Sequence, residues 1–279
     1  MIKKVLFALM ICLSIVNLFA QEGHKSIGKS QYVVTYKLIY QTDTIKGTTK
    51  DDRFMLQISD NEMSRWVSEY SYRMDSICAL PNGKKIWGRE IESAFAKNGR
   101  PDGKRSKEYI YKNYPETGDV TVSDAVAMQW YVYNDVLHPQ VWEIRDSLRI
   151  IHGYECHLAT ADFRGRRWYA WFTPEIPIDN GPWKLGGLPG LILEAYDQNN
   201  HYYYSLLGFE EKEMNIYYAL PIDLFDKTVG AIEKTDRIKL LRSKASEDLK
   251  VSMQLGSMGI QVNESQPKSY DLQEKDYRE

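Results

Sequence analysis

The chain of 279 residues carries 36 lysines and arginines against 38 aspartates and glutamates, a formal net charge of −2. This balance, without a basic stripe along the sequence, argues against a nucleic-acid-binding surface, and the length suits one domain or at most two. The 20 tyrosines and 7 tryptophans favour strands, because aromatic side chains fit a pleated, half-buried surface.

The N-terminus has the pattern of a secretory signal peptide. Two lysines precede a nearly continuous apolar run over residues 5–19, and the small Ala20 closes it. The run is shorter than the ~20 residues that span a bilayer, and no second such run follows, so we expect no transmembrane segment. The sequence therefore predicts a signal peptide over residues 1–20, cleavage after Ala20, a periplasmic or secreted location and a single mature domain over residues 21–279.

The first predicted strands follow a polar lead. Residues 32–40 alternate apolar and polar side chains with a period of two, which is typical of a strand, and residues 54–59 look like its partner. The chain from 62 to 80 is ambiguous. Residues 81–107 are polar and rich in glycine, and they predict an exposed excursion with at most a short helix over residues 91–96.

The clearest hairpin joins residues 154–163 to residues 166–172. A two-residue turn at Arg164 and Gly165 would place Asp162 opposite Arg167. On one face three alanines leave room above the sheet and three aromatic side chains surround that room, so this face is a candidate for binding an apolar ligand. A C-terminal helix could instead fill it as core. The predicted ligand face consists of Ala159, Ala161, Phe163, Trp168, Ala170 and Phe172.

A second hairpin is expected from residues 191–197 and 201–210. Beyond it, apolar residues recur at helical spacing over residues 221–256, and the polar tail 257–279 is expected to be loose. The fold class that follows is mainly β, of the α+β type: a large curved antiparallel sheet with C-terminal helices.

Several short motifs resemble catalytic or ligand-binding patterns, but the secondary structure around them does not suit those functions. Residues 23–30 (GHKSIGKS) match the phosphate-loop pattern, but a strand rather than a helix follows them. On a strand, Cys156 and His157 point to opposite faces, so they form neither a metal site nor a nucleophile–base pair. Glu194 is expected to be a solvated carboxylate. The sequence therefore predicts no catalytic residue, no metal site and no cofactor.

Two cysteines remain after the predicted cleavage, Cys78 and Cys156. An exported, oxidising environment allows a disulfide between them. The alternative is a pair of small buried thiols, and spacing alone does not decide between the two.

The most unusual backbone chemistry lies in residues 181–197. Leu188-Pro189-Gly190-Leu191 predicts a type II turn with glycine at the position of positive φ, and an apolar run that follows predicts a buried strand. The structural signature comprises Trp183, Gly186, Gly187, Leu188, Pro189, Gly190, Leu191 and Ile192.

These residues carry a family resemblance. Residues 187–192 read GLPGLI, which resembles the signature of the GLPGLI family of exported Bacteroidota proteins, and the similarity extends over residues 151–197. The resemblance implies export but no established activity and no catalytic residues. The order of hairpin, tryptophan-rich strand and proline-rich loop is also faintly similar to periplasmic lipoprotein-carrier half-barrels, a likeness of fold that does not give function.

The functional prediction is a non-enzymatic envelope protein that binds an apolar small molecule or another envelope protein. The alternative is an envelope hydrolase whose site is assembled from residues distant in sequence. A cleft with two carboxylates or several histidines would favour the hydrolase, and a smooth apolar groove would favour the binder. The oligomeric state is not predicted.

Overall fold

A computed structural model describes residues 24–43, 47–98, 106–126, 129–219, 232–246 and 272–278. The predicted signal peptide and its cleavage site after Ala20 lie outside the described residues. So do residues 221–231 and 247–256 of the predicted C-terminal helical part, and residues 257–271 of the predicted tail.

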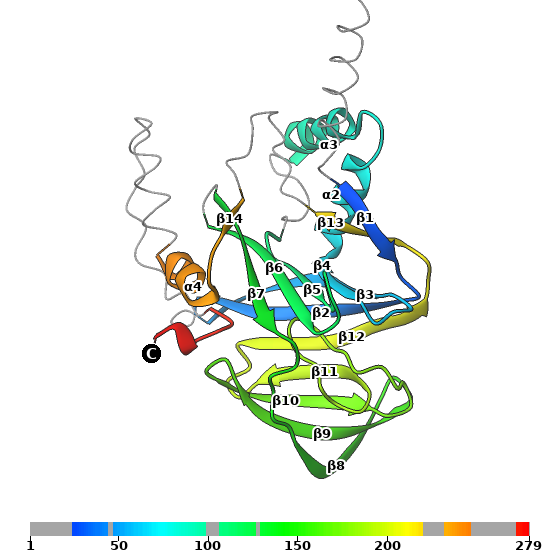
Figure 1. Cartoon of the computed structure of the whole chain (residues 1–279), viewed down its shortest axis with the longest axis vertical. Coiled ribbons are helices and arrows are strands. Elements are labelled where there is room, and N and C mark those ends of the chain that lie inside the picture. Colours follow the sequence, from blue (N-terminus) through cyan, green and yellow to red (C-terminus); the bar gives the residue numbers. More distant parts are fainter. Residues whose placement is uncertain are drawn as a thin grey trace, which may run out of the picture.

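A single large sheet dominates the described chain (Figure 1). Twelve strands run in the order β14-β7-β6-β5-β4-β3-β2-β12-β11-β10-β9-β8, and every neighbouring pair is antiparallel except β14 with β7. A second sheet pairs β1 with β13. The predicted large antiparallel sheet is thereby confirmed. The strands are β1 (His24–Lys29), β2 (Tyr32–Asp43), β3 (Thr48–Ile58), β4 (Ser64–Ser68), β5 (Tyr109–Lys112), β6 (Asp119–Val126), β7 (Gln129–Val136), β8 (Glu143–Ile151), β9 (Tyr154–Phe163), β10 (Arg166–Thr173), β11 (Leu191–Asp197), β12 (Tyr202–Glu211), β13 (Asn215–Ala219) and β14 (Glu233–Lys234).

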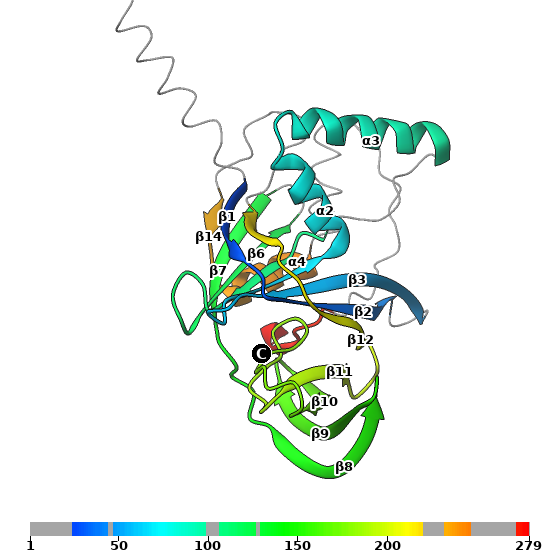
Figure 2. The same ribbon diagram turned by 90° about the vertical axis from the view of Figure 1, so that its right-hand side faces the viewer.

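The sheet is curved, and Figure 2 shows strands β8 to β11 curling away from the flatter part formed by β2 and β3. Both predicted hairpins are present. In the first, Asp162 pairs with Arg167 across β9 and β10, as the turn at Arg164 and Gly165 requires. In the second, Tyr196 of β11 lies opposite Tyr203 of β12. The alternation of side chains therefore sets the register of both hairpins.

Two helices follow β4. The first lies in residues 62–80, which the sequence left ambiguous, and the second lies in residues 81–107, the predicted polar excursion. Helix α2 (Glu69–Cys78) begins at Ser68, whose hydroxyl accepts a hydrogen bond from the backbone N–H of Ser71. Helix α3 (Gly83–Asn98) is much longer than the short helix expected over residues 91–96, and its Trp87 is buried. Trp87 packs edge-to-face on Tyr70 of α2, with ring centroids 5.5 Å apart.

Helix α4 (Arg237–Ala245) confirms a helix near the C-terminus. Its cap is Asp236, whose carboxylate accepts from the N–H of Lys239, and its Leu240 and Leu241 are buried. It packs against β6 and β7 rather than against β9 and β10. The alternative expectation, that a C-terminal helix fills the face of β9 and β10, is therefore wrong for α4.

Apolar residues pack on both faces of the sheet. The larger cluster covers the face that includes Tyr36 of β2 and Trp168 of β10, and Leu240 of α4 joins it. The smaller cluster lies around Val33, Tyr109 and Tyr111.

Candidate functional site

Residues 174–190 form a loop that covers the inner face of β9 and β10, the face bearing Ala159 and Trp168. Trp183 is its central side chain: it is buried, and its ring centroid lies 5.7 Å from those of Phe163 and Trp168. Trp183 has φ of 55°, a conformation that costs a bulky residue energy. The surrounding contacts therefore hold the indole in place.

The predicted ligand face is filled by this chain. All six of its side chains are at most 6% exposed. All of them except Ala161 belong to the larger hydrophobic cluster, together with Trp183, Leu185 and Leu188. Side chains of the loop pack over the alanines. We therefore correct the expectation of an accessible face at these positions: Ala159, Ala161, Phe163, Trp168, Ala170 and Phe172 are core.

Lys112 of β5 ties the loop to the sheet. Its buried Nζ donates to Asn180 Oδ1 at 2.9 Å, Gly181 O at 3.2 Å and Leu185 O at 2.7 Å. Asn180 in turn donates to Ser64 Oγ at 2.9 Å. Burial lowers the pKa of Lys112 to about 7, while its three acceptors match the three N–H donors of the charged form.

The predicted type II turn at Leu188–Leu191 is wrong. The N–H of Gly190 donates to Leu188 O at 2.7 Å, and the N–H of Leu191 donates to Ile176 O rather than to Leu188 O. Glycine is still required at position 190, where φ is 151° and an added Cβ would lie 2.1 Å from the carbonyl oxygen of Thr173. The close approach of two backbones, not a turn type, explains this glycine.

Cys78 and Cys156 are not bonded to each other: Cys78 ends α2 and Cys156 is buried in β9. The disulfide considered from sequence is therefore absent. The alternative of small buried thiols holds for Cys156, whereas Cys78 is only half-buried. Burial raises the pKa of the Cys156 thiol to about 11, which disfavours the reactive thiolate.

Glu194 also differs from expectation, because it is buried rather than solvated. Arg149 of β8 donates to its carboxylate at 2.5 Å, and the same guanidinium lies 4.4 Å from the ring centroid of Trp171. Asp197 is paired separately with Arg166. Within the described part of the chain, no group of three or more histidine, cysteine, aspartate or glutamate side chains could hold a metal ion.

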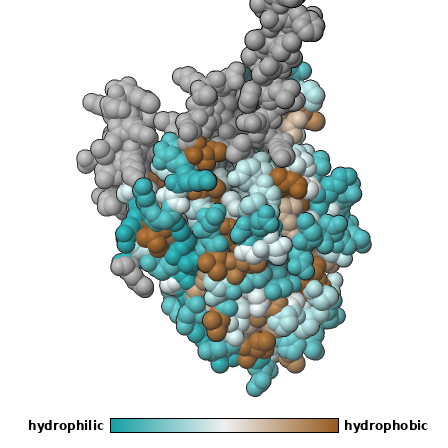
Figure 3. Space-filling view, in the orientation of Figure 1, coloured by the Kyte–Doolittle hydropathy of each residue, from teal (hydrophilic) through white to brown (hydrophobic). Residues whose placement is uncertain are grey.

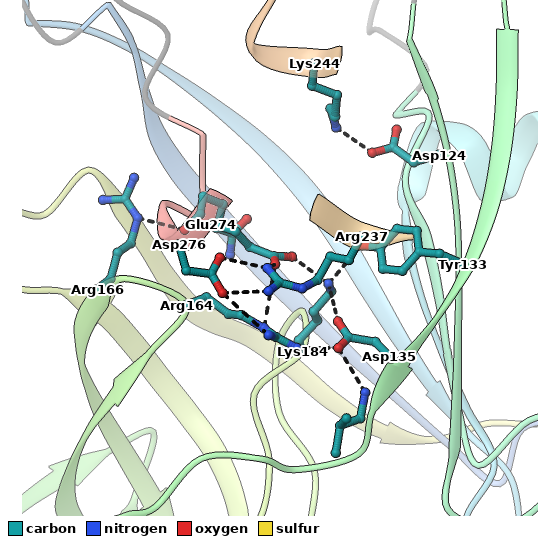
Figure 4. A network of polar contacts seen from close by, with 12 residues as sticks. Asp124, Tyr133, Asp135, Arg164, Arg166, Lys184, Arg237, Lys244, Glu274 and Asp276 are labelled. Atoms are coloured by element: carbon teal, nitrogen blue, oxygen red, sulfur yellow. Dashed lines mark hydrogen bonds and ion pairs between the residues drawn. The ribbon is translucent and has the colours of Figure 1, made fainter. Parts of the chain in front are cut away.

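A network of charged side chains joins β7, β10, α4 and the last described residues (Figure 4). Lys184 is its buried centre, with Nζ 2.9 Å from Tyr133 Oη, 2.6 Å from Asp135 Oδ2 and 2.5 Å from Glu274 Oε1. Burial alone would lower the pKa of Lys184, but these three neighbours raise it well above its ordinary value. Sequence reasoning missed this site, because its charges come from segments far apart in the chain.

The C-terminal segment, Leu272–Arg278, is packed rather than loose. It ends in a short 3₁₀ helix η1 (Asp276–Arg278), and Leu272, Glu274 and Tyr277 are buried. The expectation of a loose tail is therefore wrong for residues 272–278: their charged groups meet complementary charges on the sheet.

Strand β8 is exposed over almost its whole length. It lies at the end of the strand order, with β9 as its neighbour on one side, and every residue from Glu143 to Ile150 is exposed. Ile144, Leu148 and Ile150 lie opposite Ala159, His157 and Glu155 of β9, so all three point to the inner face.

With Val141 just before the strand, these side chains form what we call the aliphatic row. They are 55–83% exposed, whereas sheet edges are normally kept short or charged. In Figure 3, apolar surface appears at the lower end of the molecule, where Figure 1 draws β8. The aliphatic row comprises Val141, Ile144, Leu148 and Ile150.

The outer face of β8 is charged. Arg145 lies within hydrogen-bond distance of Thr160 and pairs with Glu143, and Arg149 pairs with Glu194. The register of β8 against β9 shifts between Ile144 and Leu148. Strand β8 is thus an amphipathic edge strand, and its pairing with β9 is regular over Leu148–Ile151.

None of the helices in the described residues has the length and apolar character needed to span a bilayer. Residues 164–194 match the model of a family described as "Protein of unknown function (Porph_ging)". This match contains residues 187–192, and it confirms the family resemblance over that segment. No curated protein matches the chain.

Solved structures resemble the chain weakly. Two crystal forms of PNGF-II are 14% and 13% identical, with TM-scores of 0.46 and 0.45, and cover 76% and 77% of this chain. The chain spans about a third of their length, 32% and 33%. The Pseudomonas aeruginosa MucA/MucB complex has a TM-score of 0.28 at 10% identity, covering 69% of this chain and 54% of that one. A LolA superfamily protein of Nitrosomonas europaea has a TM-score of 0.27 at 8% identity, covering 71% of this chain and 90% of that one. Likenesses at this level carry no inference about activity.

Proposed function

We propose that the protein is an exported envelope protein that binds an extended polypeptide segment of another envelope protein along β8. The N-terminal pattern that ends at Ala20 supports export. The observation that carries the binding proposal is the exposed aliphatic row on an edge strand. Large apolar side chains on a sheet edge are a liability that natural proteins usually avoid, so their presence in one row favours an interaction surface.

The shape of the site favours a polypeptide over a small apolar molecule. The inner face that would hold a lipid is filled by Trp183 and its loop. The row itself lies at the margin, next to the backbone groups of Leu148–Ile151 that face away from β9. A strand added there would gain main-chain hydrogen bonds and place alternate side chains against the row.

The charges of β8 restrict the partner further. Arg145 and Arg149 lie on the outer face, opposite in direction to Leu148 and Ile150. Both arginines are already paired with carboxylates of this chain, so a partner strand that alternates aliphatic with polar side chains would match both faces at once. Burying one aliphatic side chain fully is worth ~1.5–3 kcal/mol, so a charge in its place should weaken binding by at least tenfold.

A photo-crosslinking amino acid at Leu148 or Ile150, in cells that make the protein, tests the proposal. We expect a crosslinked envelope protein from both positions, and none from Leu80, which is equally exposed at 53% but lies between α2 and α3. The crosslinked segment, identified by mass spectrometry and synthesised as a peptide, should slow hydrogen exchange at β8 amides. Leu148→Asp should weaken the binding of this peptide by at least tenfold, while Leu80→Asp should leave the binding unchanged.

Three results would contradict the proposal. Equal crosslinking from Leu80 would show that the row is not selective. A crosslinked lipid would make the ligand a small apolar molecule. Crosslinking only to a second copy of this chain would make β8 a self-association edge.

A further inference from the structure

The C-terminal segment contacts the body as a bound peptide contacts a receptor. The body forms hydrogen bonds to the backbone of the segment: Arg166 Nη2 donates to Leu272 O at 2.7 Å and Arg166 Nε donates to Gln273 O at 2.8 Å. The N–H of Lys275 donates to Arg164 O at 2.9 Å. Main-chain hydrogen bonds of this kind supply affinity in peptide recognition, and side chains supply selectivity.

Two acidic side chains of the segment provide the selectivity. Glu274 lies 2.5 Å from Nζ of the buried Lys184 and also pairs with Arg237. Asp276 receives two bonds from the Arg237 guanidinium, at 2.7 and 2.6 Å. Paired bonds from one guanidinium fix both the position and the orientation of a carboxylate.

Apolar and aromatic contacts complete the recognition. The buried side chains of Leu272 and Tyr277 pack with Leu241 of α4. Arg242 Nε donates to Tyr277 O at 3.1 Å, and Gln273 Nε2 donates to Tyr204 Oη at 2.6 Å.

The receiving charges form a cationic cluster, which we define as Arg164, Arg166, Lys184 and Arg237 (Figure 4). Two carboxylates of the body are bonded to it: Asp135 to Arg164 and Lys184, and Asp197 to Arg166 at 2.7 Å. Four positive charges against two negative ones leave an excess of two, and Glu274 and Asp276 supply the two that balance it.

Three of the four side chains of the cluster, Arg164, Arg166 and Lys184, also have partners in the body. Lys184 is fixed by Tyr133 and Asp135, and Arg166 by Asp197. A site that is ordered before its ligand arrives loses less freedom on binding.

From this geometry we infer that the cationic cluster is a recognition site for an acidic peptide segment of the pattern Leu-x-Glu-x-Asp-Tyr. The chain's own C-terminal segment occupies it in cis, and the same segment of a second copy occupies it in trans when the cis contact is released. Exchange of an identical element between protomers needs no new interface. This inference does not depend on the partner proposed for β8.

A peptide of residues 272–279 (LQEKDYRE) tests the inference. The receptor is the full chain carrying Glu274→Gln and Asp276→Asn, which keeps side-chain size but removes the cis charges. We expect the fluorescently labelled peptide to bind this receptor and not the wild-type chain. A peptide with the same two substitutions should bind at least tenfold more weakly.

Matched variants locate the site. Adding Arg237→Gln to the receptor should abolish peptide binding, because the Arg237 side chain contacts both acidic residues of the segment. Adding Arg149→Gln, which removes a guanidinium from β8 instead, should leave binding unchanged. If the receptor is unfolded, the wild-type peptide should restore its folded circular dichroism signal.

The inference is overturned if the folded receptor binds no peptide at millimolar concentration. Equal binding of the neutralised peptide, insensitivity to Arg237→Gln, or an unfolded receptor that the peptide does not restore would overturn it as well.

Discussion

Gly190→Ala should lower the free energy of unfolding by more than the cost of the backbone conformation alone. An added Cβ would lie 2.1 Å from Thr173 O, 2.6 Å from Thr173 C and 3.0 Å from Pro174 Cα. These are backbone atoms, so no side-chain rotation relieves the clash. The positive φ costs on the order of 1–3 kcal/mol, and forcing the two backbones apart costs roughly 1–3 kcal/mol more. The expected loss in the free energy of unfolding is therefore ~2–6 kcal/mol.

Gly153→Ala is the matched control. Gly153 has φ of 88°, but an added Cβ would meet nothing within 4 Å, so only the conformational cost of about 1–2 kcal/mol applies. Urea unfolding followed by tryptophan fluorescence measures both variants. With an m-value of about 3 kcal/mol/M, a loss of ~4 kcal/mol lowers the midpoint by more than 1 M. Equal losses in the two variants would refute the steric explanation.

Two further predictions concern buried charged groups. Lys112→Met should lower the free energy of unfolding by about 3 kcal/mol or more, since it leaves three acceptor oxygens of the loop without their donor; a loss under ~1 kcal/mol in urea titration would contradict this. Partial burial, together with the charge of Asp124, raises the pKa of Glu108 from 4.5 to about 7. The native state then binds the proton more tightly, so this contribution is complete below pH ~4.5 and is lost as pH rises to ~7, by roughly 3 kcal/mol. Glu108→Gln should remove that slope from a pH series of melts, and an unchanged slope would show that another group titrates.

The sequence predicts the hairpins well because their register is determined by residues close together in the chain. A two-residue turn at Arg164 and Gly165 fixes the register, so the opposition of Asp162 and Arg167 follows from alternation alone. The same reasoning identified the small-residue face that includes Ala161. It could not identify what fills that face, because the filling residue, Trp183, comes from a loop rather than from a periodic element.

One error has a local cause, and two come from dependence on segments distant in sequence. Helix α3 was underestimated because its sequence is polar and contains Gly88, which lowers helix propensity. The turn at Leu188–Leu191 was misassigned because Ile176, not the turn itself, accepts the hydrogen bond. The C-terminal segment looked loose because the partner of Glu274 is Lys184, a pairing that no local pattern reveals.

The position of β2 within the sheet has a consequence for the order of folding. On one side β2 pairs with the adjacent β3, but on the other it pairs with β12, where Tyr40 lies opposite Tyr202. Until residue 211 has been synthesised, β2 is therefore an open edge, and the contacts of Lys184 remain incomplete until Glu274 follows. Contacts between such distant residues slow folding. The sheet therefore closes around β2 only when β12 docks, so we expect the docking of β12 to be a late and slow step of folding.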